Sequence, residues 1–435
     1  MIFLEQTVAE QPAQDNDLDL TDEGSAKPIA QGYAIVEGVY VLFSRISVHV
    51  DEAGSLWTNP AWAQDLNRHF EYIPRLKLCA PVIAAPPPPD SVEIRGRPDF
   101  ALIPLKHDGG WTSVLRNFLP NFVTVLRALR DTDIAHSDGA GWAFPLSFYL
   151  LPARVFRRFV WIVVIESSFW RTSNLQKAPL RRRIGEKIYE LLLKPAVRNA
   201  DARIFTHDGY RRYFLREGDP NYLINPACWV ETSDLIDERA LGKKFRERGA
   251  KGPLRVVFAA RLVTDKGALD VAQAIELVRD AKAPIEFVIL GDGPLRSWFE
   301  ALQAKHRKWV SYLGAVPYGQ EFFELISSAD VILSVSTSEE QPRILFDAFS
   351  QGVPVIATST DGNRCVADDK TALFVPPGNA EALADALLDL AENPNRLEAM
   401  AFAALSRMND FTHARMHETR SRYIAGILAR RRDYA

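Results

Sequence analysis

The second half of the chain shows a regular alternation of short apolar runs and longer amphipathic segments. Six aliphatic runs of strand length are separated by turns or helical segments: RVVFAA (255–260), IEFVIL (285–290), WVSYLG (309–314), DVILSV (330–335), VPVIAT (353–358) and ALFVPP (372–377). Short aliphatic strands that alternate with helices are typical of parallel βαβ units, in which helices cover both faces of a twisted sheet. The pattern therefore predicts a Rossmann-like domain.

The first half shows the same alternation of apolar runs and helical segments, but less regularly. Its apolar runs are GVYVLF (38–43), RLKLCAPVI (75–83), DTDIAHSD (131–138), RFVWIVVI (158–165) and ADARIFTH (200–207). The run 159–165 is apolar throughout, which is typical of a strand buried on both faces. We therefore expect a second doubly wound domain, so that the predicted fold class is α/β with two Rossmann-like domains facing a cleft.

The turn formers Gly218, Asp219 and Pro220 mark the expected crossover between the domains. The predicted units are an acidic disordered tail (1–32), a first domain (33–219) and a second domain (220–411). A helix at about 412–435 is expected to return and pack on the first domain.

Length and composition support two globular cores. The 435 residues exceed the size at which a single core keeps growing. A net charge of -3 argues against a dedicated nucleic-acid partner. The three cysteines lack the spacing of a zinc site or a disulfide framework, and no signal peptide is visible, so a cytoplasmic protein without a metal site is expected.

The segment TSEEQPRILFDAFSQGVPVIATSTDG (337–362) carries the first candidate chemistry. Pro342 suits the first turn of a helix whose free N–H groups would face the cleft and bind an anion. Glu339 before that helix and Asp347 within it would accept hydrogen bonds from sugar hydroxyls. The alternative, with about equal weight, is that the acids only complement the helix dipole or lie on a solvated face.

Two cations follow the first strand of the second domain, in AARLVTDKG (259–267). Arg261 and Lys266 could neutralise a diphosphate leaving group without a metal ion. The alternative is two exposed charges on a loop. The turn LGDGPLR (290–296) adds Gly291 and Gly293, which let the backbone approach a nucleotide closely.

Together and in this order, these segments resemble the second half of family-4 retaining glycosyltransferases with the GT-B fold, over about residues 255–410. The resemblance implies that Arg261 and Lys266 bind the diphosphate, Glu339 the donor sugar and Asp347 the ribose. It also implies that Gly291 approaches the donor and that Arg343, Ile344 and Leu345 offer backbone N–H groups to phosphate. The family has a second Glu where this chain has Asp347, and a Gly where it has Glu340.

The first half resembles the family in DTDIAHSDG and ADARIFTHDGYRRYFL. His136 and Asp138 are two apart on a strand and should share the face toward the cleft. The family has its active-site His where this chain has Asp138, so either Asp138 or His136 takes that role, or the site is impaired. Glu166 occupies another family His position, which implies that Glu166, together with His136, contacts the acceptor. A structural role for a lone His remains the alternative.

Cationic and aromatic residues also gather around 154–183. The set comprises Arg154, Arg157, Arg158, Arg171, Lys177, Arg181, Arg182 and Arg183, with Phe156, Phe159, Phe169 and Trp170. Such a surface attracts anionic lipid headgroups. The alternative is an Arg-rich solvated helix after Pro179.

The sequence thus predicts a metal-independent retaining glycosyltransferase, without a cofactor, that moves a hexose from a nucleoside diphosphate sugar to a saccharide or lipid-linked acceptor. Bacterial cell-surface polysaccharide synthesis at the inner membrane face fits this prediction. The alternatives are a catalytically impaired GT-B protein that binds a sugar nucleotide or a partner enzyme, and a sugar-nucleotide epimerase.

Overall fold

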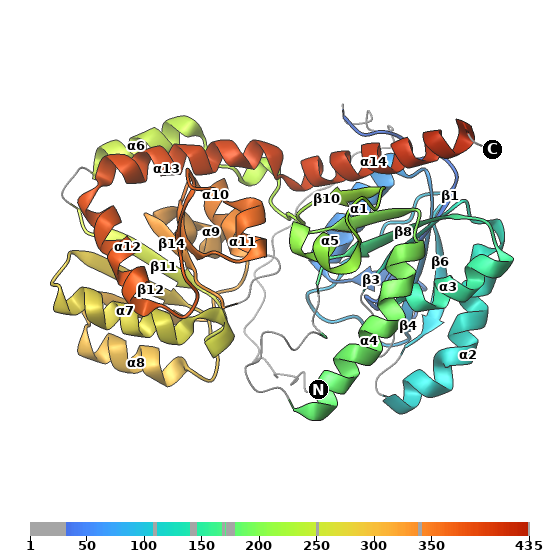
Figure 1. Cartoon of the computed structure of the whole chain (residues 1–435), viewed down its shortest axis with the longest axis horizontal. Coiled ribbons are helices and arrows are strands. Elements are labelled where there is room, and N and C mark those ends of the chain that lie inside the picture. Colours follow the sequence, from blue (N-terminus) through green and yellow to red (C-terminus); the bar gives the residue numbers. More distant parts are fainter. Residues whose placement is uncertain are drawn as a thin grey trace.

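Two α/β domains lie side by side in the computed structural model (Figure 1). The last two long helices, 394–407 and 413–433, follow one another along the same side of the molecule, the first on the second domain and the other on the first domain. The structure describes residues 32–107, 111–139, 146–167, 170, 179–248, 252–337 and 342–433. The predicted acidic tail lies outside these residues, apart from Gly32. Two sheets of mainly parallel strands, with helices on their faces, confirm the predicted fold class.

The first domain is built on a sheet in the order β10-β9-β8-β7-β1-β4-β2-β3-β5, with β6 also paired to β4. Its strands are β1 (Val39–Phe43), β2 (Val48–Val50), β3 (Leu56–Thr58), β4 (Arg75–Ile83), β5 (Val92–Glu93), β6 (Ala101–Lys106), β7 (Ile134–Asp138), β8 (Val160–Ile165), β9 (Ala202–Phe205) and β10 (Tyr222–Ile224). Its helices are α1 (Pro60–Tyr72), α2 (Trp111–Ala128), α3 (Leu146–Phe156), α4 (Leu180–Asn199) and α5 (Asp208–Phe214).

Strand β8 shows how composition places a strand in this sheet. Each of its six residues is buried, and it pairs in parallel with β7 on one side and β9 on the other. Side chains of a strand alternate between faces, so a continuous apolar run fits only where both faces are covered. The apolar run seen in the sequence therefore lies at the centre of the domain.

The second domain has a parallel sheet in the order β13-β12-β11-β14-β15-β16. Its strands are β11 (Leu254–Ala259), β12 (Ile285–Leu290), β13 (Val310–Gly314), β14 (Val331–Ser334), β15 (Val355–Thr358) and β16 (Ala372–Val375). Its helices are α6 (Glu238–Arg248), α7 (Ala268–Asp280), α8 (Arg296–Lys305), α9 (Gln320–Ser328), α10 (Arg343–Ser350), α11 (Asp361–Val366), α12 (Ala380–Glu392) and α13 (Pro394–Arg407). These strands coincide with the six apolar runs of the sequence.

The junction between the domains differs from the predicted boundary at residue 219. Strand β10 follows that boundary and pairs with β9, so the first sheet extends to Ile224. After α13 a short 3-10 turn, Met408–Asp410, precedes α14 (His413–Asp433), which returns to the first domain. Ile424 and Ile427 of α14 are buried in the same apolar cluster as residues of β1 and α1. The chain thus passes between the domains twice, through residues 225–237 (the first crossover) and residues 408–412 (the second crossover).

No helix among the described residues is long and apolar enough to cross a bilayer.

Candidate functional site

A cavity of about 770 Å³ opens at the carboxyl ends of the second domain's strands. The second domain contributes residues that follow β11 and β14, together with the start of α10. The first domain contributes the start of α1, from Asn59 to Gln64, and the first crossover contributes Trp229 and Val230. Ligands of doubly wound folds bind at this edge of the sheet. A second hollow of about 510 Å³ is lined by helices and connections only, so it lacks that position.

Asp347 is a buried carboxyl in the wall of the larger cavity, on the second turn of α10. Its Oδ1 accepts a hydrogen bond of 3.1 Å from the hydroxyl of Tyr318. Burial raises the pKa of Asp347 to about 7, although the Tyr318 bond and the nearby Arg343 charge act in the opposite direction. The structure therefore holds an acceptor group that changes its charge near neutral pH at this site.

Of the two predicted cations, Lys266 lines the cavity and Arg261 does not. Lys266 ends a 3-10 turn, Thr264–Lys266, whose preceding loop leaves Arg261 exposed. The Asp265 carbonyl in this turn accepts a hydrogen bond of 3.0 Å from the Thr337 N–H, which fixes the turn against the end of β14. Lys266 is thus the better placed cation for a ligand in the cavity.

Two glycines allow the loops of this edge to pack closely. Gly291 has a φ of 127°, and a Cβ there would lie 1.9 Å from the carbonyl oxygen of Ala260. Gly267 has a φ of 72°, and a Cβ there would lie 2.2 Å from the carbonyl oxygen of Val335. Gly291 does not line the cavity, so its role here is to let the β11 and β12 loops meet.

The first three residues of α10 do not all face the cavity. Arg343 and Ile344 line the cavity, whereas the Leu345 side chain is buried in the domain core. The Leu345 N–H was expected to donate to phosphate. In the structure it donates to the Pro342 carbonyl at 3.0 Å, so it already has a hydrogen-bond partner within the protein. Glu339, the expected contact of the donor sugar, lies outside the described residues.

The three candidates of the first domain do not line this cavity. His136 is buried, with Nδ1 2.7 Å from the Tyr40 hydroxyl, and burial holds its pKa well below the ordinary value. Asp138 lies on the same face of β7 and forms an ion pair of 3.4 Å with Arg45. Glu166 receives a bond of 3.0 Å from Arg420 of α14. The structure thus brings Lys266, Arg343, Ile344 and Asp347 together and leaves these three apart from them.

Sequence reasoning missed Tyr318, Trp229 and Gln64 as cavity residues. Tyr318 lies in the loop LGAVPYG (313–319), which precedes α9 and has no side-chain signature. Trp229 lies on the crossover, where its ring is 5.4 Å from the Arg343 guanidinium. Gln64 reaches the second domain's side from α1 and donates to Glu231 at 2.7 Å. For Tyr318 and Trp229, the one available sequence signal is an aromatic residue within a connection.

The family model for glycosyl transferases group 1 matches residues 253–393, which is the domain that carries Lys266 and Asp347. The second domain is a group 1 glycosyltransferase domain. The match confirms that the ordered motifs of this domain are those of a group 1 glycosyltransferase.

Two curated glycosyltransferases show how far the sequence similarity of this chain extends. The alpha-D-kanosaminyltransferase of Streptomyces kanamyceticus is 27% identical over 276 residues, which is 61% of this chain and 69% of the relative. The putative teichuronic acid biosynthesis glycosyltransferase TuaC of Bacillus subtilis is 31% identical over 157 residues, or 36% of each chain.

Solved structures extend the likeness in fold to both domains of the chain. A sucrose-phosphate synthase from Thermosynechococcus elongatus aligns with a TM-score of 0.63 at 17% identity, over 90% of this chain and 100% of that chain. Anabaena HepE in complex with UDP-glucose aligns with a TM-score of 0.58 at 13% identity, over 90% and 100%. At such identities the likeness shows the fold alone, and that fold is GT-B.

Proposed function

We propose that this protein is a retaining glycosyltransferase that transfers a hexose from a nucleoside diphosphate sugar to a saccharide or lipid-linked saccharide acceptor. The observation that carries the proposal is the cavity at the strand ends, in which Lys266 and the buried Asp347 both lie. A cation beside a carboxyl suits a ligand that combines a diphosphate with hydroxyl groups. The UDP-glucose complex of HepE and the name of TuaC support the donor class and a role in polysaccharide synthesis.

In this proposal the protein mainly positions the substrates and stabilises charge. The acceptor hydroxyl forms a bond to the anomeric carbon on the face from which the diphosphate leaves. The bond to the diphosphate oxygen breaks with its electron pair, and the acceptor proton passes to a departing phosphate oxygen. Lys266 offsets the negative charge that develops on the leaving group, and Asp347 holds the ribose hydroxyls. The rate is then expected to be unchanged by added Mg²⁺ or Mn²⁺.

Ligand-induced stabilisation and product analysis test the proposal together. UDP, GDP and ADP are added separately to the full chain, and one of them at 100 times its Kd should stabilise the folded state by about 2.7 kcal/mol. The sugar nucleotide of that base is then incubated with saccharide acceptors. NMR should show that the new glycosidic bond keeps the donor's anomeric configuration. A chain that none of the three nucleotides stabilises would contradict the proposal.

A second candidate is a GT-B protein that binds the donor without transferring it. The observation that favours it is that Asp138, at the family's active-site His position, is ion-paired with Arg45, while His136 is turned toward Tyr40. Tight nucleotide binding without transfer to any acceptor in a broad panel would support this candidate. Measured transfer would eliminate it.

A basic apolar surface on α4 suggests where a lipid-linked acceptor would be reached. Leu180, Ile184, Ile188 and Leu191 recur at helical spacing and are 71%, 49%, 53% and 72% exposed. The neighbouring Arg181, Arg182, Arg183 and Lys187 are exposed as well. By contrast, Trp170 of the predicted patch is buried against Tyr189 and Arg154 is ion-paired with Asp201. We propose that α4 docks on the headgroups of an anionic membrane.

Replacing Arg181, Arg182 and Arg183 with alanine should weaken binding to vesicles that contain phosphatidylglycerol by about 100-fold. Each cation near an anionic surface contributes about 1 kcal/mol, and three of them are removed. Co-sedimentation with vesicles measures the change. The matched control replaces three exposed cations of α6, Arg239, Lys243 and Arg246, and should bind like the unaltered protein. Equal losses in both variants would show that net charge, not this helix face, governs binding.

A further inference from the structure

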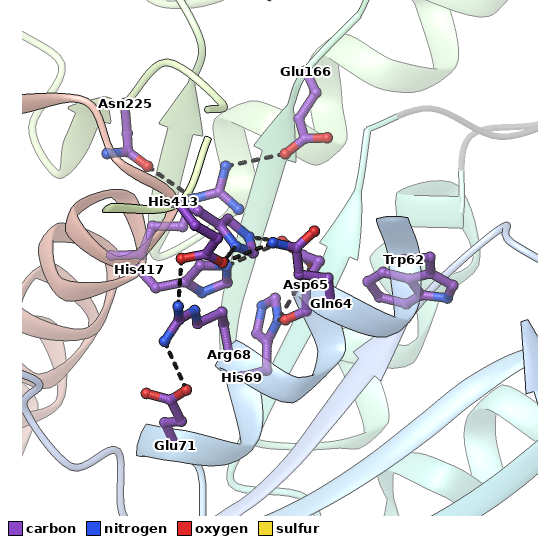
Figure 2. A network of polar contacts seen from close by, with 12 residues as sticks. Trp62, Gln64, Asp65, Arg68, His69, Glu71, Glu166, Asn225, His413 and His417 are labelled. Carbon is purple, nitrogen blue, oxygen red and sulfur yellow. Dashed lines mark hydrogen bonds and ion pairs between the residues drawn. The ribbon is translucent and has the colours of Figure 1, made fainter. Parts of the chain in front are cut away.

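A buried cluster of imidazole and carboxyl groups lies where α14 meets α1, outside the large cavity. His413 and His417 occupy successive turns at the start of α14, and Asp65 faces them from α1 (Figure 2). The Oδ1 of Asp65 lies 3.0 Å from Nε2 of His417 and 3.4 Å from Nε2 of His413. Neither histidine is exposed to solvent, and Asp65 is buried as well.

Outer partners orient both imidazole rings. The Nδ1 of His413 lies 3.0 Å from a carboxylate oxygen of Glu231, and the Nδ1 of His417 lies 3.2 Å from the Tyr72 hydroxyl. Both Nε2 atoms therefore point at the same oxygen of Asp65. Histidines that bind a metal through one nitrogen commonly donate the other N–H to a carboxylate or another polar oxygen, which fixes the tautomer and the ring. Glu231 and Tyr72 occupy those outer positions.

The distances within the cluster suit a shared ion. One ligand atom from each of Asp65, His413 and His417 lies within 4.8 Å of the others. Nitrogen and oxygen ligands about 2.0 to 2.2 Å from a zinc ion at tetrahedral angles are about 3.3 to 3.6 Å apart. Two imidazoles and one carboxylate are also a ligand set that zinc accepts. We propose that Asp65, His413 and His417 bind a zinc ion at the domain junction.

His69 completes the surroundings of the cluster. It follows Asp65 by one helical turn, and its Nδ1 lies 2.9 Å from the Asp65 carbonyl and 3.4 Å from Oδ2. This contact holds the second carboxylate oxygen of Asp65, which leaves Oδ1 for the ion. The ring of His69 packs edge to face on His417, with centroids 4.7 Å apart. Its Nε2 is buried and has no hydrogen-bond partner among the described residues.

The proposed ion has a structural role that is separate from sugar transfer. It ties the start of α14, which follows the second crossover, to α1 of the first domain. Glu231 lies on the first crossover and also contacts Gln64, the cavity residue that precedes Asp65. A zinc ion would therefore fix both crossovers relative to α1 and hold the angle between the domains. The sequence predicts no such site, because Asp65 is 348 and 352 positions from the two histidines.

Elemental analysis of the full chain is the first test. Protein purified without a histidine tag and dialysed extensively should retain about one zinc per chain. Cobalt-grown protein should show the visible absorption of tetrahedral Co²⁺ with nitrogen and oxygen ligands. Dipicolinate should lower the Tm by several degrees, and added zinc should restore it, because an ion that binds only the folded state stabilises that state. None of these measurements depends on a sugar donor or on transfer activity.

Two substitutions locate the ion. His417→Asn and Asp65→Asn should each reduce the zinc content at least tenfold and abolish the effect of dipicolinate. The matched control is His306→Asn, which alters a histidine that also lies 3.0 Å from a carboxylate, that of Glu276, in the second domain. It should retain the metal. If the unaltered protein contains less than a tenth of an equivalent, or if both variants keep their zinc, the proposal is wrong. The measurements on the unaltered protein decide even where a variant does not fold.

Discussion

Lys266→Ala is expected to lower the rate of sugar transfer by about 10² to 10³-fold. Lys266 lines the cavity, and the diphosphate gains negative charge as its bond to the sugar breaks. Groups held in place against developing charge contribute about this much to the rate when they are removed singly. Because the charge of the leaving group grows in the transition state, kcat should fall more than KM rises.

Steady-state kinetics with the preferred donor checks this result. The matched control is Lys305→Ala, which removes an exposed ammonium that pairs with Glu276 on the outer helices of the same domain. Its kcat should equal that of the unaltered protein. If kcat of the Lys266 variant stays within threefold of the unaltered value, Lys266 does not stabilise the leaving group. Arg261 and the first residues of α10 would then be the groups to examine.

Asp347→Asn is expected to remove a pH dependence from both stability and donor binding. The pKa of Asp347 is raised to about 7 in the folded protein, from an ordinary value of 3.8. Between these values the folded protein holds a proton that the unfolded chain has released. The free energy of unfolding contributed by this group therefore falls as pH rises through that window, by about 4 kcal/mol at about 1.4 kcal/mol for each pH unit. Asparagine, which does not ionise, should abolish the change.

Donor binding should show the opposite dependence on pH. A ribose hydroxyl donates to the ionised carboxylate more strongly than to the protonated acid, so the donor KM should rise as pH falls below about 7. The asparagine variant should have a KM that is about 10- to 100-fold higher and insensitive to pH in this range, which corresponds to one charge-assisted hydrogen bond or two. Chemical denaturation between about pH 4 and 8 measures the first effect, and initial rates between about pH 5 and 8 measure the second.

The control for both measurements is Asp385→Asn on α12, where the carboxylate is exposed. It should reproduce the unaltered profiles. A stability profile that keeps its slope in the Asp347 variant would assign the pH dependence to another group. A donor KM that does not change would show that Asp347 does not contact the ribose.

The sequence predicted the second domain well because its signals are local. Each strand from β11 to β16 is an apolar run bounded by turn residues, and the carboxyl ends of parallel strands converge on one edge of the sheet. Residues placed just after strands, such as Lys266, were therefore predicted to lie near the start of α10. The family match to residues 253–393 confirms a group 1 glycosyltransferase domain, and the structural likeness confirms the fold.

What escaped prediction depends on contacts between distant segments. The orientation of His136 toward Tyr40 depends on the pairing of β7 with β1, which brings together two residues that are 96 positions apart and that no short motif links. The cluster around Asp65 forms only once the chain has crossed between the domains twice. The extension of the first sheet by β10 has the same origin, because three residues of ordinary composition become a strand by pairing with β9.

The indole of Trp229 contacts both the cavity and the buried cluster at the start of α14. Its ring is 5.4 Å from the guanidinium of Arg343 at the cavity, and its centroid is 5.4 Å from that of the His413 imidazole, nearly parallel to it. A substrate that displaces this ring would therefore also act on His413, at the junction between the two domains. Coupling of this kind is reciprocal. If substrate binding shifts the equilibrium between two relative orientations of the domains, a change in that orientation changes the affinity for substrate by the same factor.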